Sequence, residues 1–401
     1  MDIVNKTRNA LAGLACVSAF LGAMACSEGQ VAPEAQLRVG AEQPAVYQPL
    51  LAGKALGLVV NQTSRVGERH LIDVLLSEQL SVKKVFALEH GVRGNVENGG
   101  HVSGGVDAQT GLPIVSLYGG KYGPDASDVS DLDWLVFDIQ DVGVRYYTYI
   151  SSLHYLMQAC ADFDVPLLVL DRPNPNGDQV GGPVLQPEFK SFVGMHPIPL
   201  VHGLTVGELA HMINGEGWLD GDKTCALTVV PVAGYHKAMH YSLPVRPSPN
   251  LPNDLSVRLY PSLGFFEGTD VSIGRGTDAP FQIIGHPQDT VGELYFTPVP
   301  KPGASENPKH KGVQLRGDAI ALTPAEATFT IDYVVSWYQR LGLAPEAFFN
   351  RAAFFDKLAG TDALRKAIVS GATTEAIESS WAADIAAFKQ QRAPYLLYPE
   401  N

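Results

Sequence analysis

The chain has 401 residues, of which 45% are hydrophobic and 18% charged, so it can bury a core and is not a disordered protein. At roughly 150 residues per domain, this length predicts two or three domains. The net charge of -13 and the lack of a basic cluster argue against nucleic-acid binding, which requires Lys and Arg side chains to neutralise phosphates.

The N-terminus has the pattern of a secretory signal. Lys6 and Arg8 precede an apolar stretch over 10–25 that is too short to span a bilayer comfortably. The small residues before Cys26 fit two processing routes, cleavage to a soluble protein or lipidation of Cys26 as the first residue of a bacterial lipoprotein. We predict a signal peptide over 1–25 and export to the periplasm or cell envelope, with Cys26 as the lipid anchor and no other membrane association.

A polar tether is predicted over 26–40, and strands then alternate with helices. Helical spacing occurs over 70–80 and 149–163, and continuous apolar runs, typical of strands buried on both faces of a parallel sheet, lie over 55–60, 84–88, 113–117, 134–139 and 166–170. This alternation predicts an α/β, Rossmann-like N-terminal domain with a mostly parallel sheet. No G-x-G-x-x-G motif follows the first strand, so no dinucleotide cofactor is predicted.

The composition changes near Gly234, after a helix predicted from the capping box at 205–208 and a strand over 227–232. Pro, Asn and Gly become frequent there, so we predict a first domain over 41–233 and a smaller α+β domain over 234–401. Within the second domain, a capping box at 323–326 predicts a helix to 341, further helices are predicted over 345–370 and 373–390, and the polar segment 301–311 is predicted to be a mobile loop.

Cysteines and metal-ligand spacings add little. Cys160 and Cys225 lie in apolar surroundings, which fits small buried residues or a single disulfide. The sequence has no CxxC motif and no Cys/His zinc spacing, so no metal site is predicted.

Polar residues follow four of the predicted strands, at the edge where parallel sheets bind ligands. Carboxylates, amides and aromatic rings suit a polyhydroxylated, acetylated ligand, and Arg suits a carboxylate on it through a bidentate pair. The candidates at these strand ends are Asn61, Glu89, His90, Arg93, Gln140, Asp141, Arg145, Tyr146, Tyr147, Asp171, Arg172 and Asn174.

Glu89 is the candidate general acid, because a glycosidase acid needs apolar surroundings that keep its carboxyl group protonated and Glu89 ends an apolar strand. Its structural alternatives are a helix cap or an ion pair with Arg93. His90 is either a catalyst or a hydrogen-bonding group that orients its neighbour. Asp141 is a candidate for a catalytic or water-positioning role, and Arg145 either clamps a substrate carboxylate or bridges Asp141.

Other candidates are equally open at this point. Asp171 and Arg172 either contact substrate or form a salt bridge at a turn, and Asn174 either contacts substrate or supports its loop through an Asx turn. Tyr146 and Tyr147 either line the pocket or pack in the core.

In the second domain, the segments 246–252 and 266–277 are either connectors or a lid over the cleft. Asn250, Glu267 and Arg275 are the candidates there to face the first domain.

Several long segments together resemble the YbbC/NamZ family of exo-acting N-acetylmuramidases, and they extend over nearly everything after the tether. Val92 departs from a position where a larger apolar or aromatic residue is common. The segments are GLVVNQTS (57–64), EHGVRG (89–94), VDAQTGLPIVSLYG (106–119), VFDIQDVGVRYYTYISSL (136–153), LDRPNPNG (170–177), VHGLTVGELA (201–210), PSPNLP (247–252), FFEGTDVSIGRGTDAPF (265–281) and RAPYLLY (392–398).

The resemblance implies a Rossmann-like domain joined to a smaller C-terminal domain, with the active site in the cleft between them. It implies removal of N-acetylmuramic acid (MurNAc) from the non-reducing ends of MurNAc-GlcNAc fragments of peptidoglycan, and neither cofactor nor metal. Recycling of the cell's own wall and foraging on the walls of other cells are both open at this point. The family's catalytic glutamate falls on the EHG motif and therefore on Glu89.

A mechanism follows as a hypothesis. Glu89 protonates the leaving oxygen, and either Asp141 or Glu267 activates water, or the substrate's own acetamido group assists while Asp141 orients it. Arg145 or Arg275 binds the lactyl carboxylate of MurNAc.

The alternative function is a non-catalytic muropeptide- or sugar-binding lipoprotein that uses the same pocket. An esterase or amidase is disfavoured because the sequence has no G-x-S-x-G elbow.

Overall fold

The computed structural model describes residues 36–93 and 104–401, and the statements below concern these residues. The predicted signal peptide over 1–25 and Cys26 lie outside the described residues. Among the described helices, none has the length and apolar character needed to cross a membrane. Cys160 and Cys225 are buried free thiols, in agreement with the first of the two interpretations above.

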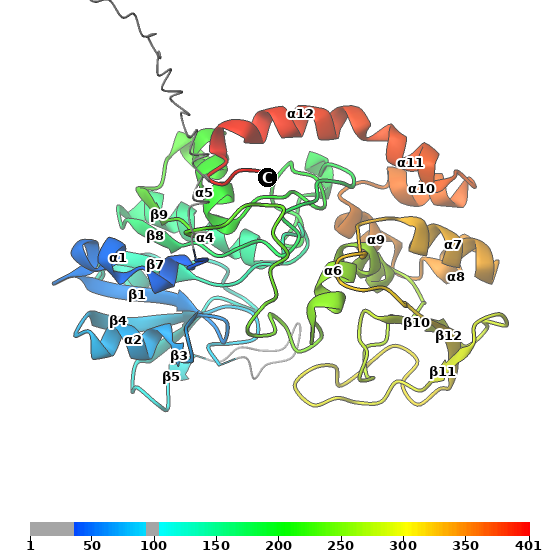
Figure 1. Cartoon of the computed structure of the whole chain (residues 1–401), viewed down its shortest axis with the longest axis horizontal. Helices are drawn as coiled ribbons and strands as arrows, with labels where there is room; N and C mark the ends of the chain where they lie inside the picture. Colours follow the sequence, from blue (N-terminus) through cyan, green and yellow to red (C-terminus); the bar gives the residue numbers. More distant parts are fainter. Residues whose placement is uncertain (1–35, 94–103) are drawn as a thin grey trace, which may run out of the picture. The chain divides into compact units, whose positions relative to one another are not determined.

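A seven-stranded sheet forms the centre of the N-terminal half (Figure 1). Six strands are parallel and lie in the order β6-β4-β1-β7-β8-β9, while β5 (Gly105–Val106) pairs antiparallel with β6 at the edge. The parallel strands are β1 (Ala55–Val60), β4 (Ser81–Ala87), β6 (Pro113–Ser116), β7 (Trp134–Asp138), β8 (Leu167–Leu170) and β9 (Leu227–Val230). Ranked by position in the chain, this is the doubly wound order 3-2-1-4-5-6, which confirms the predicted Rossmann-like domain.

Both faces of the sheet are covered, which explains why its strands are apolar without interruption. On β1, Leu56, Leu58 and Val60 pack in one cluster with α1 (Pro44–Leu51) and α2 (Leu71–Ser77). Val59 packs in the other cluster with α4 (Tyr149–Phe163) and α5 (Val206–Gly215). The predicted capping box is present, since the Thr205 hydroxyl accepts from the Glu208 backbone at the start of α5.

The crevice between β1 and β7, where this strand order usually binds dinucleotides, is closed by the protein's own polar groups. The hydroxyl of Ser64 donates to the carbonyl of Asp138, and the backbone N–H of Gln140 donates to the Thr63 hydroxyl at 3.0 Å. The Asn61 carboxamide oxygen accepts from the Thr63 backbone at 2.9 Å. The loops after the two central strands are therefore bonded to each other across this crevice.

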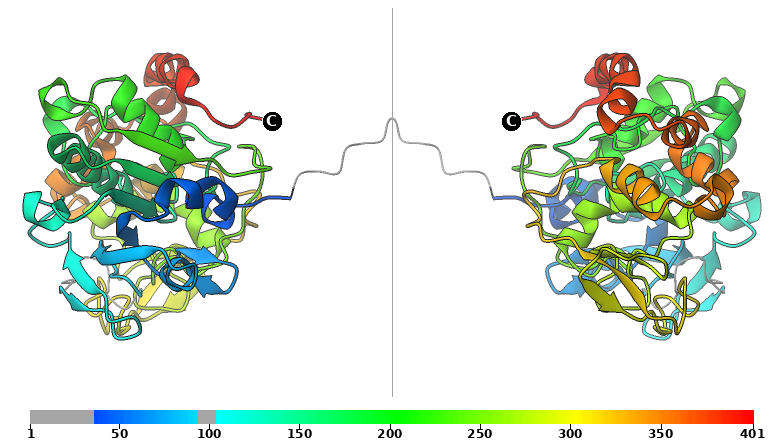
Figure 2. Two further views of the ribbon diagram at one scale, coloured as in Figure 1. Left: turned by 90° about the vertical axis from the view of Figure 1, so that its left-hand side faces the viewer. Right: turned by 90° about the vertical axis from the view of Figure 1, so that its right-hand side faces the viewer.

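The C-terminal half contains a small sheet and a series of helices, as predicted for an α+β domain. The left panel of Figure 2 shows the molecule from the side of the first half, coloured blue to green, and the right panel shows it from the side of the C-terminal half, coloured yellow to red. The antiparallel order is β10-β12-β11, and β2 (Arg65–Val66) and β3 (Arg69–His70) form a separate hairpin in the first half. The elements are α6 (Asp254–Leu263), the 3-10 helix η4 (Gly264–Gly268), β10 (Ile283–His286), β11 (Leu294–Phe296), β12 (Leu315–Ala319), α7 (Asp332–Leu341), α8 (Pro345–Phe348), α9 (Ala352–Ala359), α10 (Ala363–Val369), α11 (Thr374–Ser380) and α12 (Ala382–Arg392). The first half also contains the short helix α3 (Ala126–Val129) and the 3-10 helices η1 (Gly40–Glu42), η2 (Pro187–Phe189) and η3 (Asp220–Asp222).

The helix predicted from 323 begins only at Asp332, which corrects that prediction. The capping contact itself forms, since the Thr323 backbone donates to the Glu326 carboxylate at 2.8 Å. The residues that follow give their backbone groups to other parts of the protein: Phe329 N–H donates to Gln179 and Thr330 N–H to Ser262. Without these groups the turn cannot propagate as a helix.

The last residues assigned to the tether belong to the fold. Arg38 N–H donates to the Ala233 carbonyl at 3.0 Å, and Gly40 N–H donates to the Asp171 carbonyl at 2.8 Å. A side chain at Gly40 would meet the Asp171 backbone at 2.6 Å, so the contact requires glycine. The folded region therefore begins before residue 41.

Arg145 joins the two halves through a fully buried guanidinium group. Its Nη1 donates to the carbonyls of Pro183 and Ile198, both at 2.7 Å. Its Nη2 donates to the carbonyls of Leu358 and Ala359, at 3.2 and 2.6 Å, in the last turn of α9. Burial lowers the pKa of Arg145 to about 9, so the group remains charged at neutral pH. Neither predicted role, a substrate clamp or a partner of Asp141, fits a group occupied in this way.

Asp141, the predicted catalytic or water-positioning residue, is also buried. Its Oδ1 accepts from the Gly143 backbone at 2.7 Å, and its Oδ2 has no hydrogen-bond partner among the described residues. Burial raises the pKa of this carboxyl to about 7, despite the opposing backbone hydrogen bonds of Gly143 and Val142.

Replacement of Arg145 by Met is expected to lower the free energy of unfolding by about 3 kcal/mol or more, because several buried carbonyls lose their donor at about 1–3 kcal/mol each. Urea denaturation of the two proteins measures the difference. Arg145→Lys keeps the charge but loses the planar set of guanidinium donors. Its free energy of unfolding is expected to lie between those of the parent and of Arg145→Met. Arg69→Met, at an exposed position, is the control. A parent-like midpoint for Arg145→Met would show that the guanidinium does not hold the halves together.

Asp141 is expected to make the protein less stable as the pH rises. Its folded-state pKa of about 7 lies above the unfolded value of about 3.9, so its contribution is complete below the lower value and is lost towards the higher one. Asp141→Asn keeps the acceptor for Gly143 and is expected to flatten this fall, with a higher Tm than the parent at pH 8. Thermal melts between pH 4 and pH 8 test this, with exposed Asp384→Asn as the control. Equal slopes for Asp141→Asn and the parent would refute it.

Candidate active site

A cavity of about 300 Å³ is lined by residues from both halves of the chain. Its N-terminal wall comes from the ends of β4 and β6, the loop after β7, and the segment around 192. Its C-terminal wall comes from α6, η4, the loop after η4, and α9. The lining residues are Glu89, Tyr118, Tyr146, Tyr147, Thr148, Phe192 and Val193 on the first wall, and Tyr260, Gly264, Glu267, Arg275, Arg351, Phe354 and Leu358 on the second.

Glu89 enters the cavity from the end of β4 and is held by three hydroxyl groups. The Thr148 hydroxyl donates to Glu89 Oε2 at 2.8 Å. Tyr118 is also hydrogen-bonded to the carboxylate, and burial together with this negative charge raises the pKa of Tyr118. Tyr149 donates to the Glu89 carbonyl at 3.1 Å and accepts from Asn61 Nδ2 at 2.9 Å. Asn61, predicted to bind substrate, therefore acts on Glu89 through Tyr149.

Glu267 and Arg275 enter the cavity from the other wall as an ion pair. Arg275 Nε donates to Glu267 Oε1 at 2.5 Å. Burial raises the pKa of Glu267, but the charges of Arg275 and Lys309 outweigh this effect and the net pKa is below the ordinary value. Glu267 is therefore a carboxylate at neutral pH.

Lys309 holds the turn that carries Glu267. Its ammonium group donates to the carbonyls of Phe266, at 2.5 Å, and of Thr269. Burial lowers the pKa of Lys309 to about 8. The segment 301–311 was predicted to be a mobile loop, but its end is docked on η4 by this side chain, and the prediction is corrected there.

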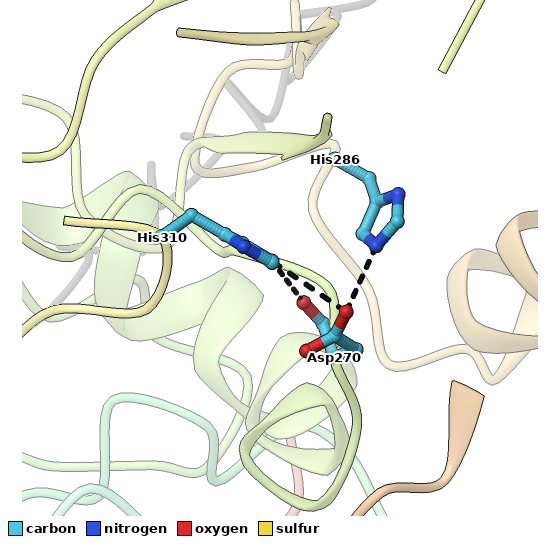
Figure 3. Close-up of side chains that lie close together, drawn as sticks. All are labelled: Asp270, His286 and His310. Atoms are coloured by element: carbon cyan, nitrogen blue, oxygen red, sulfur yellow. Dashed lines mark hydrogen bonds and ion pairs between the residues drawn. The ribbon is translucent and has the colours of Figure 1, made fainter. Parts of the chain in front are cut away.

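The neighbouring residues Asp270, His286 and His310 form the cluster in Figure 3. Their ligand atoms lie within 4.8 Å of one another, and two imidazoles with a carboxylate are a donor set that transition metals accept. His286 Nδ1 accepts from the Gln288 backbone, which places its proton on Nε2, 3.0 Å from the Asp270 carboxylate. His310 Nε2 lies 2.6 Å from the Asp270 carbonyl, and Asn350 donates to the other carboxylate oxygen at 2.8 Å. These hydrogen bonds give the cluster a structural role, because they fix the turn at Asp270 that follows Glu267.

The two predicted tyrosines line the cavity, but their hydroxyl groups are bonded elsewhere. Tyr146 donates to the carbonyls of Tyr260 and Pro261, both at 2.8 Å. Tyr147 donates to the carbonyl of Pro247 at 2.8 Å. They therefore present ring surface to the cavity and connect the two walls.

Two amide side chains predicted to contact substrate support loops instead. Gln140 Nε2 donates to the carbonyls of Asp141 and Pro173 at 2.8 and 2.7 Å. Asn174 Nδ2 donates to the Leu204 carbonyl at 2.9 Å, and its oxygen accepts from Asn176, which is the predicted Asx contact. Both side chains are buried outside the cavity, where they donate hydrogen bonds to the carbonyls of loops.

Asp171 and Arg172 are buried structural residues, and their side chains do not pair with each other. Asp171 Oδ2 accepts from the hydroxyls of Thr205 at 2.7 Å and Tyr398 at 2.6 Å. Arg172 instead pairs with Asp138 on the neighbouring strand, through Nε at 2.6 Å and Nη2 at 3.0 Å. Neither of the roles predicted for this dipeptide, substrate contact or an internal salt bridge, matches these contacts.

The last three predicted residues also lie outside the cavity. Arg93 pairs with Asp107 at 2.9 Å rather than with Glu89. Asn250 donates to Ala304 at 2.7 Å and lines a separate cavity of about 280 Å³. His90 is 2% exposed and has a left-handed backbone with φ 69°.

Several cavity residues have no counterpart in the predictions. Tyr118 and Thr148 lie in segments that carried the family resemblance, so their position was available as a signal. Tyr260 and Phe354 have the spacing of ordinary helical core residues. Arg351 follows no motif and reaches the cavity only through long-range packing.

An aromatic stack continues from the cavity towards solvent. Phe192, which lines the cavity, stacks on Tyr122 with ring centroids 4.4 Å apart. Tyr122 also stacks on Tyr155 at 5.7 Å and is 40% exposed. Flat rings of this kind offer an apolar face to a sugar.

Comparisons with known proteins agree with this architecture. The family model for the N-terminal part of exo-beta-N-acetylmuramidase NamZ matches residues 56–255, and the model for its C-terminal part matches 258–398. These models divide the chain between 255 and 258, whereas composition placed the boundary at 233.

Similar proteins extend over most of the chain. It is 38% identical over 371 residues to peptidoglycan beta-N-acetylmuramidase NamZ of Bacillus subtilis (strain 168), with 88% of this chain and 89% of the relative covered. A crystal structure of a DUF1343 family protein from Bacteroides fragilis NCTC 9343 matches with a TM-score of 0.84 and 43% identity, covering 91% of this chain and 100% of that one. A second DUF1343 protein from the same organism matches with a TM-score of 0.78 and 29% identity, covering 90% and 99%. The chain therefore belongs to the exo-beta-N-acetylmuramidase NamZ family.

Proposed function

We propose that this protein is an exo-β-N-acetylmuramidase, a glycoside hydrolase that removes MurNAc from the non-reducing ends of peptidoglycan fragments such as MurNAc-GlcNAc. The observation that carries the proposal is that Glu89 and Glu267, from opposite walls, line one cavity of sugar size. Glycoside hydrolysis uses such a pair of carboxyl groups. The family relationship points to the same reaction.

Glu89 is the general acid in this proposal. Its proton passes to the glycosidic oxygen as the bond from C1 of MurNAc to that oxygen breaks, so the leaving sugar departs as an alcohol. Thr148 and Tyr118 hold the carboxyl group in place from the N-terminal wall. The exposed stack of Tyr122 on Phe192 offers the leaving sugar a surface outside the cavity.

Glu267 is the second group. Arg275 and Lys309 keep it ionised, as a base requires, and it takes the proton of the water whose oxygen attacks C1. Asp141, the other candidate from the sequence, lies outside the cavity. If the acetamido group of the substrate attacks C1 instead, Glu267 is not needed as a base.

The alternative, a non-catalytic sugar- or muropeptide-binding protein, would use the same cavity. Binding alone gives no reason for one carboxyl group held by hydroxyls and a second held ionised on the opposite wall. We therefore favour the hydrolase, and the assay below separates the two.

We also propose that the protein acts outside the cytoplasm, in the periplasm or cell envelope, as a lipoprotein anchored at Cys26 that contributes to cell-wall recycling. The support is the signal pattern over 1–25 and the position of peptidoglycan outside the cytoplasmic membrane.

Glu89→Gln is expected to lower kcat/KM on MurNAc-GlcNAc by about 10²–10⁴-fold, the usual contribution of a general acid. On para-nitrophenyl β-MurNAc the loss is expected to be much smaller, because nitrophenolate leaves without being protonated. Glu267→Gln is expected to slow both substrates alike, because water attack is common to them. Steady-state kinetics of the parent and the two variants make the comparison.

The control is Glu346→Gln, which changes an exposed carboxylate. A fully active Glu267→Gln variant would show that Glu267 is not the base, and would favour attack on C1 by the acetamido group of the substrate. A folded parent that binds MurNAc-GlcNAc but cleaves neither substrate would support the binding protein instead.

Cys26→Ala is expected to move the protein from the membrane fraction to the soluble fraction of the envelope. Fractionation and immunoblotting of cells that produce the full chain measure this, with Cys16→Ala as the matched control. Soluble wild-type protein with a mature N-terminus at residue 26 would favour simple cleavage over lipidation.

A further inference from the structure

Among the described residues that line the cavity, one guanidinium group forms no ion pair with a carboxylate. Four charged side chains line it: Glu89, Glu267, Arg275 and Arg351. Glu267 and Arg275 are paired at 2.5 Å. Within residues 36–93 and 104–401, Arg351 forms no ion pair with any carboxylate. Its charge is therefore available to a ligand in the cavity.

Arg351 is held in a geometry that suits a carboxylate. Its residue caps the start of α9, where its backbone N–H donates to the Gly268 carbonyl at 3.2 Å. The guanidinium carbon lies 4.4 Å from the centre of the Phe354 ring, which also lines the cavity. Nη1 makes one long contact of 3.4 Å with the Glu267 carbonyl. A guanidinium group is planar, so stacking one face on a ring leaves its in-plane N–H groups able to meet a bidentate partner.

The other cations near the cavity are already engaged. Arg145 donates to four backbone carbonyls and has no surface in the cavity. Arg275 is neutralised by Glu267, and Lys309 donates to the turn that carries Glu267. The two arginines predicted from the sequence to bind a substrate carboxylate, Arg145 and Arg275, are therefore both occupied.

We propose that Arg351 binds the lactyl carboxylate of the MurNAc unit and so distinguishes MurNAc from GlcNAc. This inference rests on the proposed function. MurNAc differs from GlcNAc by a lactyl ether on O3, which adds one negative charge. An anion that enters a cavity with two glutamates needs a cation that is not already paired, and among the described lining residues Arg351 provides one.

The test uses the full chain and para-nitrophenyl β-MurNAc, its lactyl methyl ester, and the β-GlcNAc analogue. Arg351→Gln is expected to raise KM for the MurNAc substrate by about 10- to 100-fold with little change in kcat, because a charge-assisted hydrogen bond is lost from ground and transition states alike. The ester and the GlcNAc substrate, which lack the anion, are expected to lose much less activity than the MurNAc substrate does. Arg351→Lys is expected to retain part of the preference.

Arg69→Gln, at an exposed position on the β2–β3 hairpin, is the matched control. An unchanged preference for the MurNAc substrate over its ester in Arg351→Gln would overturn the inference, as would an equal loss on all three substrates. Titration calorimetry with MurNAc-GlcNAc and Glu89→Gln, with and without Arg351→Gln, gives a readout that needs no turnover. Weaker binding in the double variant would support the inference even if the parent hydrolyses nothing, so the inference and the proposed function can fail separately.

Discussion

The cavity depends on one buried cation, Arg145, which has no counter-ion within residues 36–93 and 104–401. Arg145 belongs to the loop that supplies Tyr146, Tyr147 and Thr148. It donates to the carbonyls of Pro183 and Ile198 in the first half and to two carbonyls at the end of α9 in the second. Carbonyls in the last turn of a helix carry partial negative charge, so α9 offers a favourable end to this guanidinium. The approach is so close that a side chain at Gly360 would meet Arg145 Nη2 at 2.6 Å. The distance between the two walls is therefore set by a buried hydrogen-bond network rather than by loose packing.

Buried hydrogen bonds also explain where the cavity lies along the edge of the sheet. In doubly wound folds, ligands usually bind where the strand order reverses. Here that position is occupied by Asn61, Thr63 and Gln140, and by the ion pair of Asp138 with Arg172 below them. The open part of the edge is displaced towards β4 and β6, where the C-terminal half supplies the opposite wall. With the usual crevice closed, the cavity of this Rossmann-like fold lies between its sheet edge and the C-terminal half.

The fold could be predicted largely from the sequence because both faces of the sheet are covered. Burial on both faces makes a strand continuously apolar, and the run over 55–60 matches β1 residue for residue. The predicted helix over 149–163 matches α4 in the same way. The helix expected from 323 failed because its backbone groups bond to Gln179 and Ser262, partners that are far away in the sequence.

The site was predictable only in part, and for a physical reason. Glu89, Glu267 and Arg275 follow motifs and do line the cavity. Arg145 and Asp171 have equally polar sequence contexts but turn into the protein, and local sequence cannot show which way a strand-end side chain turns. Arg351 arrives through the packing of α9 against η4, which no local pattern records.

The contact between Tyr398 and Asp171 affects when the first half of the chain obtains its hydrogen-bond partners during synthesis. Tyr398 donates to Asp171 at 2.6 Å, and its hydroxyl oxygen also accepts from the Val232 backbone at 2.9 Å. Leu397 N–H donates to Glu208 in the first turn of α5 at 2.9 Å. The half of the chain that contains Glu89 is synthesised first, yet Asp171 and Glu208 obtain these partners only after residues 397 and 398 have been made. The Rossmann-like half therefore acquires these hydrogen bonds later than the rest of its own contacts.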